Sequence, residues 1–169
     1  MEWISRSKDV IAIAVAVTAV GLSLAAVLIQ RRQQRRHAFQ QIHEVLMTPE
    51  HQRGRWLMWE IAGAGQLPAA GSADYYLINR TLGVLNLLAI YVKNGVVPRQ
   101  WVLEVWHHPL QQMADAVTML ADDRVAVANW RPWPQLDWLI GQTIDYRSEE
   151  GCCLPPPPTA ALPPGAPPA

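Results

Sequence analysis

An uninterrupted apolar segment dominates the N-terminal part of the chain. Val10–Ile29 contains 20 residues without a charge, and its polar breaks are Thr18 and Ser23. Because an α-helix rises about 1.5 Å per residue, such a helix reaches roughly 30 Å, the thickness of the hydrocarbon core of a bilayer. The alternatives are a cleaved secretory signal, which has a shorter apolar core and a small-residue cleavage site, and a buried soluble helix. The pattern predicts a transmembrane helix over residues 10–30.

The charges on either side of this segment predict its orientation. Arg6 and Lys8 precede it, and four clustered arginines follow it directly. These four are Arg31, Arg32, Arg35 and Arg36. Since Lys and Arg are retained on the cytoplasmic side, we expect the N-terminus outside and the C-terminal domain in the cytoplasm. The lipid bilayer is therefore the first predicted partner, and a single-pass protein of the inner membrane the predicted location.

Apolar residues recur at helical spacing through most of the remaining chain. The spacing over Ala38–Met47 continues the first helix, and Thr48-Pro49-Glu50 predicts a second one with an N-cap, an N1 proline and an acidic first turn. That helix should end near Gly65. We expect a loop over 66–72, followed by the widest apolar stripe of the chain, over 74–94, with Asn94-Gly95 as its stop. So wide a stripe predicts the central helix of a bundle.

Prolines mark the last two predicted helices. Pro98 should open a helix whose apolar positions keep their phase across Pro109, which favours a bend over a chain reversal. Pro132-Trp133-Pro134 should end it, and Pro134–Arg147 should form the last helix. The fold class predicted is all-α: one N-terminal transmembrane helix, a small cytoplasmic helical bundle over residues 31–148, and a disordered Pro-rich tail over 149–169.

The distribution of charge along the chain agrees with a membrane-anchored domain. The formal net charge is zero, with eight basic and five acidic residues through residue 60 and six against nine beyond it. A basic half beside the bilayer suits anionic headgroups. Because the arginines adjoin the membrane and no basic stripe recurs later, we expect no nucleic-acid partner.

Candidate chemistry is sparse. His43-Glu44 has Met47 where a zinc motif needs its second histidine, and His107-His108 are adjacent on a helix, which we interpret as a solvated pair. Cys152 and Cys153 stand in the tail as reduced thiols with no further ligands nearby. Without a phosphate loop, nucleophile elbow or metal framework, we expect no catalytic, cofactor-binding or metal site, and no enzymatic activity.

Two groups of residues are candidates for packing or interaction. Asn79 and Asn86 lie seven apart on the most apolar helix, where a buried amide needs a hydrogen-bond partner. They should fix helix register, and a ligand-binding role is the alternative. The chain has eight tryptophans, which could fill the core. The alternative is an exposed cluster that docks a partner, formed by Trp130, Trp133 and Trp138.

The stretch Asn79–Val97, with Leu85-Asn86 and Gly95, followed by a Trp-containing helix, resembles a family of bacterial single-pass proteins. That family is catalogued as domain of unknown function 4760. The resemblance implies a short N-terminal anchor and a helical domain over residues 10–147, with no established activity. Many members have an acidic residue where this chain has Ala89, so no role of that acid carries over.

These patterns lead to one leading hypothesis and two alternatives. We expect a membrane-anchored helical scaffold or partner-binding module with an unknown protein partner. One alternative is a small-molecule or lipid-responsive membrane sensor, which needs a pocket with convergent polar groups. The other is a phage- or defence-type membrane effector, whose anchor would self-associate into a homo-oligomer.

Overall fold

The computed structural model describes residues 2–148, with side-chain surroundings from residue 17 onward. Within that range the chain is all-α, with five helices and no strand. They are α1 (Glu2–Leu46), α2 (Pro49–Ala64), α3 (Ala73–Lys93), α4 (Arg99–Ala128) and α5 (Pro134–Gly141). The predicted tail, with Cys152 and Cys153, lies outside the described residues, as do the side chains of Arg6, Lys8 and the first part of the predicted anchor.

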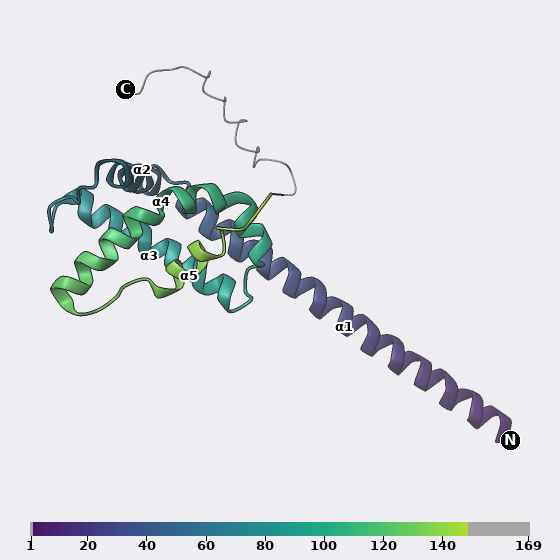
Figure 1. Cartoon of the computed structure of the whole chain (residues 1–169). Coiled ribbons are helices and arrows are strands. Elements are labelled where there is room, and N and C mark those ends of the chain that lie inside the picture. Colours follow the sequence, from purple (N-terminus) through teal and green to yellow (C-terminus); the bar gives the residue numbers. More distant parts are fainter. Residues whose placement is uncertain (1, 149–169) are drawn as a thin grey trace, which may run out of the picture.

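Helix α1 is one continuous helix of 45 residues, as its unbroken pattern predicts. Its N-terminal part projects well beyond the other helices, and its C-terminal part lies against them (Figure 1). It ends where Pro49 opens α2. Thr48 takes the predicted N-cap position but makes no cap hydrogen bond, because its hydroxyl donates to the Val45 carbonyl instead.

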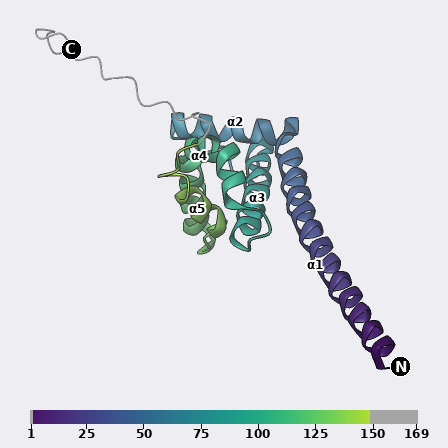
Figure 2. The ribbon, with the colours of Figure 1, turned by 90° about the vertical axis from the view of Figure 1, so that its right-hand side faces the viewer.

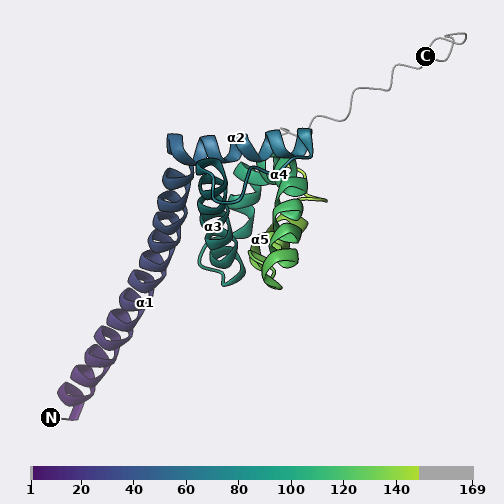
Figure 3. The same cartoon turned by 90° about the vertical axis from the view of Figure 1, so that its left-hand side faces the viewer.

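Helix α2 forms one end of the bundle. Figures 2 and 3 show α2 lying across one end of α3 and α4, at the end farthest from the start of α1. Gly65 ends α2 in the left-handed conformation, with φ 66°, which a residue without Cβ adopts at no steric cost. Ser72 caps α3 by accepting a hydrogen bond from the Tyr75 amide at 3.2 Å.

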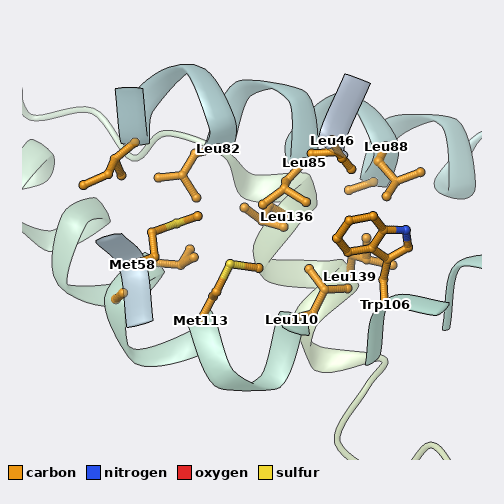
Figure 4. Close-up of a cluster of buried hydrophobic side chains, with 14 of the residues drawn as sticks. Leu46, Met58, Leu82, Leu85, Leu88, Trp106, Leu110, Met113, Leu136 and Leu139 are labelled. Atoms are coloured by element: carbon orange, nitrogen blue, oxygen red, sulfur yellow. The ribbon is translucent and has the colours of Figure 1, made fainter. Parts of the chain in front are cut away.

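Helix α3 is the centre of the bundle, as predicted. It contacts each of the other helices, and its apolar stripe is buried. Figure 4 shows side chains from all five helices meeting in one core. The core residues labelled there are Leu46, Met58, Leu82, Leu85, Leu88, Trp106, Leu110, Met113, Leu136 and Leu139.

Helix α4 continues through Pro109 as one helix without a chain reversal, as the phase of its apolar positions predicts. Its stripe is buried on both sides of the proline, from Leu103 and Trp106 to Val117 and Leu120. The hydrogen bond that Pro109 cannot donate would have gone to the carbonyl of Val105, a residue on the exposed side of α4.

The last helix is shorter than predicted, since α5 ends at Gly141 and not at Arg147. The Gln142 amide bonds to the Trp138 and Leu139 carbonyls, and the Thr143 amide bonds three residues back in a tight turn. The Gln111 side chain of α4 donates to the Thr143 carbonyl. Beyond the turn, the Tyr146 hydroxyl donates to the carboxylate of Glu104. Contacts with α4 therefore replace the helical bonds that residues 142–147 would have made.

Candidate functional site

Residues 17–30 of α1 form an exposed, largely apolar segment. Between residues 17 and 30 no side chain is buried, although large apolar residues make up much of the segment. They are Val17, Val20, Leu22, Leu24, Val27, Leu28 and Ile29, with 46–68% of each side chain exposed. The first α1 residues to pack against the bundle are Ala38 and Phe39, followed by the buried Ile42 and Leu46. This part of α1 is therefore largely exposed.

Among the residues with described side-chain surroundings, α3 is the single helix that is long and apolar enough to cross a membrane. That is weak evidence for a span, because the core helix of any bundle meets the same criterion. Ile78, Leu82 and Leu85 of α3 are fully buried among the other helices. The predicted span at 10–30 begins in residues whose side chains are outside the description, and its membrane placement stays a prediction.

A basic cavity lies where α1 passes the start of α4. Arg31, Arg32 and Arg35 line it from α1, together with Leu28, and Pro98 and Trp101 complete it. Its volume is about 370 Å³, and none of the six lining residues is acidic. Trp101 is held in place by an edge-to-face contact with Phe39 of α1, with ring centroids 6.3 Å apart. Arg36, the fourth arginine of the cluster, does not line the cavity.

A buried polar junction joins α1, α2, α3 and α4. The guanidinium of Arg55 donates to the Leu46 carbonyl at the end of α1 and lies 5.0 Å from the ring of Trp106. His51 Nδ1 is 3.0 Å from the Thr81 hydroxyl, which itself donates to the Leu77 carbonyl. Burial lowers the pKa of both Arg55 and His51. These groups fasten helices to one another.

The two asparagines also make hydrogen bonds between helices. Asn79 donates to the Tyr75 carbonyl at 2.7 Å and accepts from Arg124 of α4 at 3.1 Å. Asn86 accepts from the Leu136 amide of α5 at 3.1 Å. Both amides therefore have protein partners, and neither lines the basic cavity.

The tryptophans divide between core and surface. Trp106 is buried, while Trp133 and Trp138 are half-buried and pack against the core. Of the three residues in the alternative exposed cluster, Trp130 alone is exposed, because Trp133 and Trp138 flank the start of α5 where it meets α3. The exposed pair that the sequence did not single out is Trp56 and Trp59 on α2, and Arg53 stacks 4.1 Å over the ring of Trp56.

The expectation that His107 and His108 form a solvated pair is wrong. His107 is buried, with Nδ1 2.7 Å from the Leu103 carbonyl and its ring 5.1 Å from that of Tyr146, so His107 and His108 are not a solvated pair. The segment after α5 covers His107, which a helical continuation to Arg147 would not predict. Within the described residues, no group of three or more His, Cys, Asp or Glu side chains could hold a metal ion.

Comparisons with protein-family models, curated proteins and solved structures find no match to this chain. The resemblance to domain of unknown function 4760 therefore stays a prediction. Three surface features stand out: the exposed apolar residues of α1 between 17 and 29, the basic cavity beside them and the exposed tryptophans of α2.

Proposed function

We propose that this chain is a single-pass membrane protein whose helical domain is held at the inner membrane face and acts as a scaffold or partner-binding module. The observation that carries the proposal is the uncovered apolar surface of α1 over residues 17–29. In water, so large an exposed apolar area is unfavourable, at about 25 cal/mol per Å². A bilayer removes this area from water, and a helix satisfies its own backbone hydrogen bonds there.

The arginines after this segment support the proposed orientation. Arg31 and Arg32 begin directly where the apolar run stops, and all four arginines of the cluster are exposed. At the cytoplasmic surface they meet anionic headgroups, which favours this side of the membrane for the domain.

Alkaline carbonate extraction of bacterial membranes tests the anchor. The full chain should stay in the membrane pellet, and a variant without residues 1–36 should appear in the soluble fraction. A variant with Leu22→Arg and Leu24→Arg keeps the length of α1 but should insert poorly, since each arginine near the centre of a span costs about 2.5–3.5 kcal/mol. Release of the full chain by carbonate would contradict the proposal.

The partner-binding half of the proposal is supported by α2. This helix lies at the end of the bundle farthest from the start of α1 (Figure 2), and Trp56 and Trp59 are exposed there. Exposed tryptophans are frequent anchors of protein interfaces. Photo-crosslinkers placed at positions 56 and 59 should capture the same protein in intact cells. A crosslinker at the exposed Asp115 of α4 is the control, and equal capture from all three positions would argue against a specific surface.

The second candidate function is a lipid-responsive membrane sensor, which the arginine-lined cavity favours. The remaining alternative, a phage- or defence-type effector, depends on self-association of the anchor, which sedimentation of the full chain in detergent would reveal.

A further inference from the structure

The basic cavity is built from one face of α1 and one turn of the bundle. Leu28, Arg31, Arg32 and Arg35 follow one another at spacings of three, one and three residues, which places them on one side of the helix. Opposite them lie Pro98 and Trp101, at the start of α4. The two walls are about 65 residues apart in the sequence, so the cavity exists only when α1 and the domain are assembled.

The positive charge of the cavity is not neutralised by the protein. Arg31, Arg32 and Arg35 make no ion pair with any described residue, and no acidic side chain lines the cavity or occurs in the first turn of α4. Elsewhere the described surface arginines Arg80 and Arg131 do pair with carboxylates. Three guanidinium groups around one cavity therefore offer many N–H donors without an acceptor.

The chemistry of those donors fits a phosphate group. A guanidinium presents its N–H groups as a planar fork that matches two oxygens of a phosphate, and such charge-assisted hydrogen bonds are short and strong. A volume of about 370 Å³ lies within the range of roughly 300–1,000 Å³ that small ligands occupy. Leu28 and the half-buried Trp101 add an apolar wall, which a free inorganic ion would not use.

The cavity lies beside the C-terminal end of the apolar segment of α1. Leu28 is the second-to-last residue of the apolar segment, and Arg31 follows two residues after that segment ends. If α1 spans the bilayer as proposed above, the cavity lies at the level of the lipid headgroups, with Leu28 toward the acyl chains and the arginines toward the phosphates. An indole is well suited to this interface, since its ring is apolar and its N–H can bond to water or to a headgroup.

We propose that this cavity binds the phosphate of an anionic phospholipid headgroup. The inference rests on the proposed membrane anchor. The lipid would bridge α1 and the start of α4, because each provides one wall of the site.

Arg35 and Arg36 form a matched pair for the test. They are adjacent, both are exposed, and each contributes one positive charge beside the membrane, but Arg35 lines the cavity and Arg36 does not. The full chain, Arg35→Gln and Arg36→Gln are purified in detergent and compared by native mass spectrometry. The first probe is an equimolar mixture of phosphatidylglycerol and phosphatidylcholine, and the second is inorganic phosphate with phosphatidylcholine alone.

We expect the unaltered chain to retain phosphatidylglycerol in preference to phosphatidylcholine. Arg35→Gln should lower the affinity for phosphatidylglycerol at least about ten-fold, the effect of losing a charge-assisted contact. Arg36→Gln should lower it by about five-fold or less, the effect of one diffuse surface charge. Circular dichroism should find the two variants equally helical, since neither side chain holds the bundle together.

Three results would overturn the inference. Equal losses in Arg35→Gln and Arg36→Gln would mean a diffuse electrostatic attraction without a site. Binding of inorganic phosphate without a preference for phosphatidylglycerol would mean a free anion as the ligand. Absence of any lipid preference in the unaltered chain would leave the cavity without this role. Failure of the anchor itself is distinguished from all three, because the full chain would then be released from membranes by carbonate.

Discussion

Asn86 Oδ1 of α3 accepts a hydrogen bond from the backbone amide of Leu136, 50 residues later in the sequence, at 3.1 Å. The Leu136 amide belongs to the first turn of α5, where helix amides lack the usual i−4 partner, and it also bonds to the Trp133 carbonyl at 3.0 Å. The N-cap residue of α5 is Trp133, which has no side-chain acceptor and adopts a positive φ of 54°. Asn86 thus supplies from α3 the side-chain acceptor that the N-cap residue of α5 lacks.

Replacing Asn86 tests this role. Asn86→Leu removes the acceptor and should lower the free energy of unfolding by about 0.5–2 kcal/mol, the usual worth of an N-cap. Asn86→Asp keeps an oxygen at the same place and should retain most of the stability. Urea unfolding followed by circular dichroism measures both. If leucine is tolerated as well as aspartate, the amide does not fasten α5.

Gly54 tests the close approach of α2 and α3. A Cβ at Gly54 would lie 2.1 Å from the Thr81 hydroxyl oxygen, and that hydroxyl also bonds to His51. Gly54→Ala should therefore separate the helices and cost about 1–3 kcal/mol of stability. Gly63→Ala is the control on the same helix, where nothing lies within 4 Å of the added Cβ.

Gly63→Ala should change the free energy of unfolding in the opposite direction from Gly54→Ala. Alanine at position 63 removes the entropic penalty of glycine in a helix and should stabilise the protein by up to about 1 kcal/mol. Thermal unfolding of the two variants side by side measures the difference. Equal effects would show that α2 and α3 are not in such close contact at Gly54.

His51 predicts a pH dependence of stability. Burial is the main cause that lowers its pKa in the folded state below the usual 6.5, the nearby Arg80 and Arg55 lower it further, and Glu50 opposes them. Below pH 6.5 the unfolded chain therefore binds a proton that the folded chain resists, so the free energy of unfolding falls as the pH falls, until the folded-state pKa is passed. Above pH 6.5 His51 contributes no slope.

Urea midpoints between pH 8 and pH 5 measure this dependence. His51→Gln keeps a hydrogen-bonding side chain beside Thr81 but cannot titrate, so it should flatten the part of the slope that His51 causes. An unchanged slope in His51→Gln would assign the pH dependence to other groups.

The helices were largely predictable because their signals are local. Pro49, Gly65, Gly95 and Pro98 each act on the backbone at their own position, and the boundaries of α2, α3 and the start of α4 follow from them. The end of α5 could not be predicted from the sequence, because the apolar spacing continues through Ile144. The contacts of the segment after α5 come from Gln111 and Glu104 of α4.

The residues of the candidate sites could be predicted from the sequence, but their partners in space could not. The arginine cluster is visible in the sequence, but its cavity requires Pro98 and Trp101 to lie beside α1, which depends on the packing of the whole bundle. The partners of Asn79 and Asn86 are likewise 45 and 50 residues away. Whether Trp133 and Trp138 fill the core or form an exposed cluster was left open, because the pattern around the prolines does not reveal which face of α5 meets α3.

Truncation tests whether the domain is independent of the anchor. The α1 residues that pack against the bundle begin at Ala38, so removal of residues 1–36 should leave a soluble domain that unfolds cooperatively. Removal of residues 1–48 also takes Ile42 and Leu46 from the core and should lower the unfolding midpoint clearly. Circular dichroism with a urea titration compares the two fragments. A first fragment without helical signal would contradict an independent bundle.

The central claim is that α1 anchors the domain on the cytoplasmic side of the membrane, and paired reporter fusions at the C-terminus test it most directly. Green fluorescent protein folds in the cytoplasm, whereas alkaline phosphatase becomes active outside it. We predict a fluorescent first fusion and an inactive second one, with the difference weakened when Arg31, Arg32, Arg35 and Arg36 are all replaced by glutamine. An active phosphatase fusion and a dark fluorescent one in the unaltered chain would contradict the claim.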